Sequence, residues 1–259
     1  MMATILKDII GKVLILKLNR PDKFNCFNRE MALLMQKILE EAAGDKAIRA
    51  IYITGEGKAF CAGQDLAEAI DPNGPGIEKI VTDHYNPIIR HIRAIEKPVI
   101  CAVNGVAAGA GANIALACDI VVGSENTSFI QAFSKIGLIP DSGGTFFLPR
   151  LIGLQRASAL MFTGDKVSAQ DALNFGMIYK LFQADSLFIN GLDLAHQLSE
   201  MPTLALGLTK KLLNNSFYTT YENQLQEEGK AQVIAAKSDD YNEGVKSFLE
   251  KRKPIFKGS

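Results

Sequence analysis

Apolar and polar positions follow two different periods along the first half of the chain. Short apolar runs typical of strands occupy residues 13–19, 48–54, 99–103 and 120–123. Between the first two runs, apolar residues recur at helical spacing from Met31 to Ala42, and Asn28 stands where a helix N-cap is expected. A similar helical pattern runs up to Ile95. This alternation predicts strands that are separated by helices, as in an α/β fold.

Helical spacing dominates the last third of the chain. It is carried by residues 153–163, 186–199, 203–216, 222–237 and 242–250, and Ser168 to Asp171 has the form of a capping box. A helical tail of this length cannot bury all its apolar faces on one sheet. We therefore expect an α/β core over residues 1–195 and a helical region over residues 196–259 that packs across a subunit interface.

A glycine-rich turn separates the strand at residues 99–103 from a helix that should begin at Ala110. Gly105, Gly109 and Gly111 crowd this turn. A helix that begins at such a turn presents unpaired amides and the positive end of its dipole, which suits a negatively charged group. Close packing of the helix on the sheet would explain the glycines equally well. The residues that follow fit neither a dinucleotide fingerprint nor a phosphate loop.

Composition narrows the classes of partner. Lys plus Arg and Asp plus Glu are both 28, so the charge balance argues against a nucleic-acid or anionic membrane surface. The sequence shows no signal-peptide pattern and no long unbroken apolar segment, so we expect a cytoplasmic protein with no membrane contact. No metal site is expected, because the cysteines and histidines lack ligand spacing, and the thiols should be reduced. The cysteines are Cys26, Cys61, Cys101 and Cys118.

Three motifs, in order and spacing, resemble the enoyl-CoA hydratase/isomerase (crotonase) superfamily. They are Phe60-Cys-Ala-Gly-Gln-Asp-Leu66, Asn104-Gly-Val-Ala-Ala-Gly-Ala-Gly111 with Asp119, and Ile136-Gly-Leu-Ile-Pro-Asp-Ser-Gly-Gly-Thr145 with Leu148-Pro-Arg150. The resemblance extends from about residue 4 to the C-terminus. It implies a spiral core of repeated ββα units, a helical C-terminal trimerisation region, and a homotrimer or dimer of trimers.

The resemblance also implies a coenzyme A thioester whose carbonyl oxygen is held by two backbone amides. In this sequence the donors are the amides of Gln64 and Ala110. Many relatives have glycine where Ala110 stands, so the backbone there must tolerate a Cβ. Coenzyme A enters as part of the substrate, and no separate cofactor is implied. The implied substrate-binding residues are Lys23, Phe24, Ala62, Gly63, Asp65, Leu66, Gly109, Tyr85, Asn113, Phe133 and Lys253.

Lys253 belongs to a basic cluster, Lys251-Arg-Lys253 with Lys257. The cluster is equally consistent with a solvated helix end that complements the helix dipole and with contact to the nucleotide of coenzyme A, from a neighbouring subunit.

Hydratases of this superfamily use two glutamates, whose positions are held here by Asn113 and Phe133. Neither side chain exchanges a proton near neutral pH, which disfavours ordinary hydration. Asp141 stands where related isomerases and a dehalogenase carry their working carboxylate. Taken alone, Asp141 is better explained as the N-cap of a helix that starts at Ser142; the resemblance reverses this preference and favours a catalytic carboxylate.

A carboxylate at this position could act as a base or as a nucleophile. The nucleophile reading suits a dehalogenase, which needs a His/Trp environment, whereas the aligned positions hold Tyr85, Asn86 and Phe133 and the chain has no Trp. The resemblance therefore favours an isomerase with Asp141 as its base.

Several segments are most similar to the isomerases of phenylacetate degradation, which convert ring-1,2-epoxyphenylacetyl-CoA to oxepin-CoA and shift enoyl-CoA double bonds. They are residues 64–66, the Pro/Gly-rich loop 71–76, Tyr85-Asn-Pro87, residues 133–141 and residues 240–252. Tyr85 and Phe133 would then line an aromatic-sized pocket, or they are ordinary core aromatics. The loop is expected to lie close to the ligand.

The alternatives are a Δ3,Δ2-enoyl-CoA isomerase, an enoyl-CoA hydratase, a non-catalytic acyl-CoA binder and an RNA-binding homologue. Asp141 argues against the non-catalytic binder, which has no need of a carboxylate, and the balanced charge argues against RNA binding.

Overall fold

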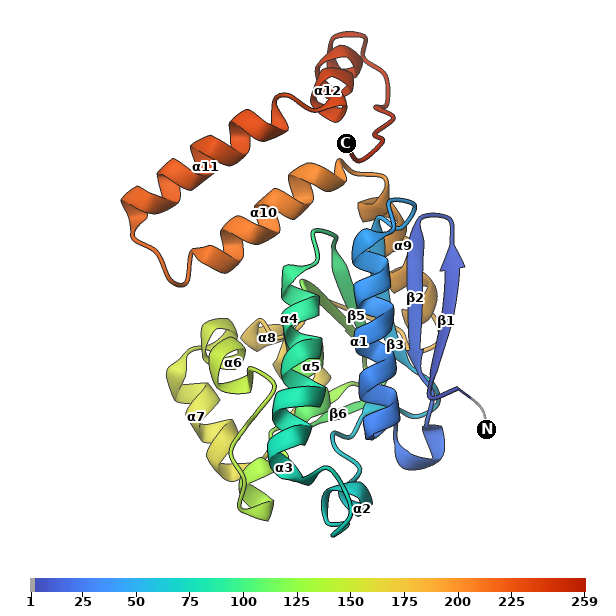
Figure 1. Ribbon diagram of the computed structural model, residues 1–259, viewed down its shortest axis with the longest axis vertical. Helices are drawn as coiled ribbons and strands as arrows, with labels where there is room; N and C mark the ends of the chain where they lie inside the picture. The colour runs from blue at the N-terminus through green and yellow to red at the C-terminus, as the bar shows by residue number, and fades with distance from the viewer. Residues whose placement is uncertain (1–2) are drawn as a thin grey trace.

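The computed structural model describes residues 3–259, which form two sheets surrounded by helices (Figure 1). The larger sheet has the strand order β1-β2-β3-β5-β7-β10 and the smaller sheet the order β4-β6-β8-β9. Their bounds are β1 Ile5–Ile10, β2 Val13–Leu18, β3 Ala50–Gly55, β4 Ala59–Cys61, β5 Val99–Val103, β6 Val106–Ala108, β7 Ile120–Ser124, β8 Ser128–Ile130, β9 Lys166–Ser168 and β10 Lys180–Phe182.

Consecutive strand pairs repeat along the chain. In each of the pairs β3/β4, β5/β6 and β7/β8, the first strand joins the larger sheet and the second joins the smaller one. Neighbouring units pair in parallel, as in Ile100↔Ile120 in the larger sheet and Ala107↔Phe129 in the smaller one. Helices connect one unit to the next. This is the spiral of ββα units that was expected, and the α/β fold class is confirmed.

Helices cover both faces of the larger sheet, with α1 and α4 in front of it and α9 behind it in Figure 1. Because both faces are covered, every residue of β5 is buried, as its unbroken apolar sequence predicted. The helix bounds are α1 Arg29–Gly44, α2 Leu66–Ala69, α3 Gly76–Lys79, α4 Asn86–Ala94, α5 Ala110–Leu116, α6 Gly144–Ile152, α7 Leu154–Thr163, α8 Ala169–Phe175, α9 Leu187–Ser199, α10 Thr203–Asn215, α11 Tyr221–Ala235 and α12 Asp239–Leu249. Two 3-10 turns, η1 Pro21–Lys23 and η3 Ala132–Ile136, complete the helical segments together with a π-helical turn, η2 Ile80–Tyr85.

The pattern that predicted one long helix up to Ile95 is divided into α3, η2 and α4. Pro87 has no N–H, so it cannot donate to the Asp83 carbonyl one turn earlier, and regular α-helical bonding fails at this point. The Gln36 side chain on α1 donates instead to the carbonyls of Asp83 (2.8 Å) and His84 (2.9 Å). The π-helical turn is therefore stabilised by a residue from another helix.

The last three helices extend from the body of the molecule (Figure 1). Helix α10 is anchored by Lys210, whose Nζ lies 2.7 Å from an Asp119 carboxylate oxygen; Arg93 contacts the other oxygen at 3.0 Å. The division predicted between residues 195 and 196 falls inside α9, which packs on β3 and β5. Over residues 3–259, no helix combines the length and apolar character needed to span a membrane.

Candidate active site

Two turns place two unpaired backbone amides next to each other. Phe27 pairs with the segment around Gln64: its N–H donates to Gly63 O (2.7 Å), and its carbonyl accepts from Asp65 N–H (2.8 Å). The intervening Gln64 amide donates to no acceptor within residues 3–259. A Cβ added at Gly63 would lie 3.6 Å from Ala110 N, so the turn that carries Gln64 touches the turn that carries Ala110.

Gly109 supplies the unusual backbone conformation that the second amide requires. Its φ of 52° and ψ of −129° lie in a region that is essentially restricted to glycine. Ala110 can then be the first residue of α5 without left-handed backbone, which answers how an alanine is tolerated there. As a first-turn residue its amide has no intrahelical acceptor, and none is present elsewhere in the described chain. Both amides therefore lack an acceptor within residues 3–259, and the turns that carry them lie against each other.

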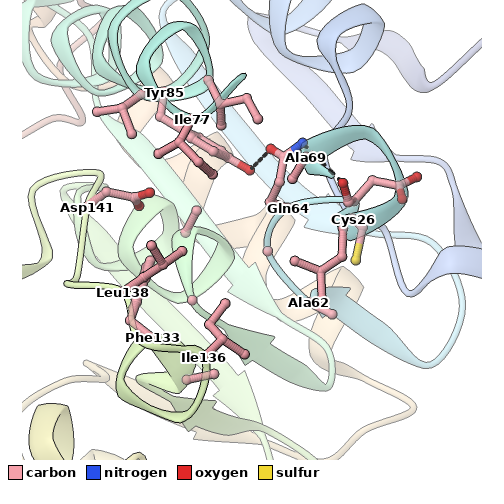
Figure 2. A pocket seen from close by; sticks show the side chains of 18 of the residues that line it. Cys26, Ala62, Gln64, Ala69, Ile77, Tyr85, Phe133, Ile136, Leu138 and Asp141 are labelled. Carbon is pink, nitrogen blue, oxygen red and sulfur yellow. Dashed lines mark hydrogen bonds between the residues drawn. The ribbon is translucent and has the colours of Figure 1, made fainter. Parts of the chain in front are cut away.

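Gln64 and Ala110 both line a cavity of about 520 Å³ with mainly apolar walls (Figure 2). Its walls include most of the residues expected at the site: Lys23, Ala62, Gly63, Gln64, Asp65, Leu66, Tyr85, Gly109, Ala110, Phe133 and Asp141. Tyr85 donates its hydroxyl proton to Gln64 Oε1 at 2.8 Å, and both Tyr85 and Phe133 are buried as well as lining the cavity. Within residues 3–259, no group of three His, Cys, Asp or Glu side chains could hold a metal ion.

Asp141 lies on the loop between η3 and α6, and its carboxyl group faces the cavity in Figure 2. The Ser142 hydroxyl donates to Asp141 Oδ1 at 2.8 Å. Burial raises the pKa of Asp141, and the bond from Ser142 opposes part of that increase. Helix α6 begins only at Gly144 and has no side-chain cap. The interpretation of Asp141 as an N-cap of a helix starting at Ser142 is therefore wrong.

Asn113 has a different place from the one expected. It is fully buried on α5 and does not line the cavity. Its Nδ2 donates to the Asp141 backbone oxygen (2.8 Å), and its Oδ1 accepts from Gln131 Nε2 (2.8 Å). A buried amide must be satisfied in this way. Asn113 is thus a support for the Asp141 loop, which corrects its assignment as a substrate-binding residue.

Asp65 is the other carboxyl group in the cavity wall, and it is held by an ion pair and a helix-capping hydrogen bond. Arg20 Nη2 lies 2.8 Å from its Oδ2, and its other oxygen accepts from Ala67 N–H at the start of α2. Burial would raise the pKa of Asp65, but the hydrogen bond and charge of Arg20 outweigh burial and lower it. Among the residues that line the cavity, Asp141 is the carboxyl group without a cation within salt-bridge distance.

The arrangement of these cavity residues agrees with the family whose model matches nearly the whole sequence. The enoyl-CoA hydratase/isomerase family model matches residues 8–259. The chain belongs to the enoyl-CoA hydratase/isomerase family.

Relatives in this family include both kinds of enzyme. The chain is 44% identical to the 1,2-epoxyphenylacetyl-CoA isomerase of Escherichia coli K12, with 100% of both chains covered. It is 37% identical to a probable enoyl-CoA hydratase of Rhodobacter capsulatus, with 98% of both covered. The structure of an enoyl-CoA hydratase from Bacillus anthracis has a TM-score of 0.95 at 31% identity, covering 99% of this chain and 100% of that one. The chain is therefore an acyl-CoA isomerase or hydratase.

Besides Asn113, two further residues expected at the substrate site of this enoyl-CoA hydratase/isomerase family member lie outside the cavity. Phe24 is adjacent to Lys23 but is more than half exposed, in a left-handed conformation. Lys253 is exposed and follows α12, a helix that lies at the end of the molecule opposite α2 and α3 in Figure 1. Within one chain, Lys253 is therefore not part of the cavity wall.

Sequence reasoning missed much of the apolar wall. These residues are Cys26, Ala67, Ala69, Ile77, Ile80, Val81, Ala132, Ile136 and Leu138. Several of them are exposed in this chain, including Ile77, Ile136 and Leu138. Their signal was the presence of large apolar residues in and beside loops, where polar residues are usual.

Proposed function

We propose that this enzyme isomerises acyl-CoA thioesters through an enolate. The amides of Gln64 and Ala110 hold the thioester oxygen, and Asp141 removes a proton from the acyl group. The electron pair left on carbon delocalises onto the held oxygen. Asp141 then returns the proton to a different carbon, so no atom enters or leaves overall. The amides stabilise charge that develops during the reaction, which is how an oxyanion hole accelerates it.

The observation that carries this proposal is the isolation of Asp141. It is the cavity carboxyl group without a cation partner, and burial raises its pKa toward the range useful for a base. The two positions that hydratases use hold Asn113, which is buried and bonded to the Asp141 loop, and Phe133, which cannot exchange a proton. One proton carrier suits isomerisation better than the addition of water.

The substrate that we propose is ring-1,2-epoxyphenylacetyl-CoA, converted to oxepin-CoA, with an enoyl-CoA double-bond shift as a related activity. Three observations support it: the apolar cavity of about 520 Å³, the aromatic side chains of Tyr85 and Phe133 in its wall, and the 44% identical relative that bears this activity in its name. Both reactions move a proton from one carbon to another beside a held thioester. In the epoxide, the bond between the two epoxide carbons also breaks, so that the six-membered ring expands to the seven-membered oxepin with no atom gained or lost.

A comparison of three substrates tests the proposal. Purified protein is incubated with ring-1,2-epoxyphenylacetyl-CoA, a 3-enoyl-CoA and crotonyl-CoA, and products are followed by mass and absorbance. We expect crotonyl-CoA to be hydrated at least about a hundredfold more slowly than the better isomerisation substrate is converted, because one acid/base group typically contributes about 10²- to 10⁴-fold. Hydration at a comparable rate would favour the hydratase alternative, which the 37% identical relative represents.

A further inference from the structure

A chain of hydrogen bonds links the cavity to the start of α1. The Tyr85 hydroxyl donates to Gln64 Oε1 at 2.8 Å. Gln64 Nε2 in turn donates to Glu68 Oε1 at 3.1 Å. The Glu68 carboxylate also accepts from the backbone N–H of Arg29, at 2.9 and 3.0 Å for its two oxygens. Glu68 therefore contacts both the backbone at the first turn of α1 and the side chain of Gln64, which lines the cavity.

The chemistry of these groups fixes the direction of every bond in the chain. A carboxylate only accepts hydrogen bonds, so the NH₂ end of Gln64 must face Glu68. The carbonyl end of Gln64 then faces Tyr85 and can only accept. The Tyr85 hydroxyl must therefore donate its single proton to Gln64 Oε1. Toward a ligand in the cavity, the Tyr85 oxygen can then only accept a hydrogen bond.

Tyr85 is also held firmly in place. The residue is 1% exposed, its ring packs on Phe27 with centroids 5.9 Å apart, and it ends the π-helical turn that Gln36 stabilises. Figure 2 shows its hydroxyl and the Asp141 carboxyl group on the wall of the same cavity. A bound acyl group would therefore lie beside a fixed acceptor as well as beside the base.

We propose that Glu68 is a positioning residue which, through Gln64, makes the Tyr85 hydroxyl a hydrogen-bond acceptor toward the cavity. An acyl group that carries a hydrogen-bond donor, such as a hydroxyl, on the side that faces Tyr85 is thereby bound more tightly than one without the donor, and the epoxide oxygen of the proposed substrate, which can only accept, is directed away from Tyr85. This inference rests on the proposed function in one respect, namely that the acyl group occupies this cavity. A purely structural role for Glu68, as a cap for α1, would leave acyl selectivity unaffected.

Binding of unreactive ligands tests the inference. Phenylacetyl-CoA and its derivatives with hydroxyl or fluorine at the ortho, meta or para ring position are titrated by calorimetry. The proteins are the wild type, Glu68→Gln, Tyr85→Phe and the double variant. At one ring position or more, the wild type should bind the hydroxyl derivative about 2- to 10-fold more tightly than the fluoro derivative, which is the worth of one neutral hydrogen bond.

Tyr85→Phe and Glu68→Gln should change the ratio of hydroxyl to fluoro affinity through the same interaction. Tyr85→Phe removes the preference because it removes the acceptor. Glu68→Gln weakens it, because two amides in series can turn over together and allow Tyr85 to donate to the cavity. In the Tyr85→Phe background, Glu68→Gln should leave the ratio unchanged, as expected for residues that act as one unit.

Asn28→Ala is the matched control for the cap. It removes the Asn28 side chain that accepts from Met31 N–H in the same helical turn, while Glu68 stays in place. This variant should lower the melting temperature and keep the ligand ratio. The inference fails if phenylacetyl-CoA binds but no ring position shows a preference that depends on Tyr85, or if Glu68→Gln changes the ratio equally in both backgrounds. If instead the preference is present but no isomerisation substrate is converted, the proposed function fails alone.

Discussion

Asp65 and Asp141 show at the scale of single residues how environment separates two identical carboxyl groups. Both line one cavity. Arg20 holds Asp65 and, despite partial burial, lowers its pKa. Within residues 3–259, the Asp141 carboxyl group accepts a side-chain hydrogen bond only from the Ser142 hydroxyl, and burial raises its pKa. A carboxyl group whose charged form is destabilised is the better base, which supports the proposed role of Asp141 in proton transfer and a structural role for Asp65.

Replacement of Asp141 by Asn should remove the base and little else. Turnover should fall by about 10²- to 10⁴-fold, since the amide cannot carry the proton. Acyl-CoA binding should stay within several-fold, because the amides of Gln64 and Ala110 are untouched. The Asn side chain can still accept from the Ser142 hydroxyl, and Asp141 caps no helix, so the melting temperature should not fall. Steady-state kinetics with a melting curve measure both; an active Asn variant would remove Asp141 from the mechanism.

The pH dependence of the wild type should report the raised pKa of Asp141. Because the base works ionised, kcat/KM should fall with decreasing pH through a pKa above the ordinary value of 3.8. A raised native pKa also means that the native state binds the proton more tightly than the unfolded chain does. The stability that this proton contributes is fully present below the unfolded pKa and is lost as pH rises through the native pKa.

Asp141→Asn should accordingly gain stability relative to the wild type as pH increases through that same window, because the buried charge no longer forms. Urea unfolding of both proteins at a series of pH values measures this difference. The idea is contradicted by an acid limb of kcat/KM at or below the ordinary aspartate range, or by a stability difference that does not vary with pH.

At the scale of elements, predictions succeeded where the signal is local. Asn28 caps α1 by accepting from Met31 N–H, and Ser168 caps α8 by accepting from Asp171 N–H, as their spacing predicted. The division of the helix before Ile95 was missed because its cause is partly remote. Pro87 is visible in the sequence, but the compensating Gln36 lies on another helix.

The candidate site could be predicted from sequence only in part, for the same reason. The spacing of glycines indicated a bare turn before Ala110, but its meeting with the Gln64 turn came from resemblance alone, since it joins distant segments. The supporting role of Asn113 depends on where Gln131 and the Asp141 backbone lie in the fold. No local pattern carries that information.

The turn before α5 gives a prediction for a whole element. Gly109→Ala forces a Cβ onto a φ of 52° and a ψ of −129°, a strain of about 1–3 kcal/mol. Relief of that strain would move the start of α5 and with it the Ala110 amide. We expect stability to fall by about that amount, and kcat to fall by about tenfold or more through the oxyanion donor.

Gly44→Ala is the control for this variant. Gly44 ends α1, has no positive φ, and a Cβ there would meet nothing within 4 Å. It should leave kcat unchanged and, if it alters stability, raise it by up to about 1 kcal/mol, opposite in sign to the effect of Gly109→Ala. Chemical denaturation and steady-state kinetics on the two variants make the comparison; a Gly109→Ala enzyme with full activity would show that the amide geometry does not depend on this turn.

At the scale of the whole molecule, the C-terminal helices stand apart from the core. Helix α10 is anchored through Lys210 and Asp119, but α11 buries none of its residues in this chain. Large apolar side chains are exposed along these helices and in the turn between α10 and α11: Leu213, Tyr218, Tyr221, Leu225, Val233, Ile234, Phe248 and Leu249. An exposed apolar surface of this kind marks an interface in a protein that is otherwise well packed.

We therefore expect the protein to assemble as a trimer or as a dimer of trimers, the arrangement implied by the family resemblance. Phe248 and Ile139 make a matched test, since they are 82% and 81% exposed but lie on α12 and in the loop before Asp141 respectively. Phe248→Asp should shift the mass measured by light scattering toward the monomer, because a charge buried in an apolar interface is costly. Ile139→Asp should leave the mass unchanged, because Ile139 lies outside the C-terminal helices that are expected to form the interface. Because apolar contact between copies is what would cover α11 and α12, a monomeric mass for the unaltered protein at micromolar concentration would contradict the expected assembly.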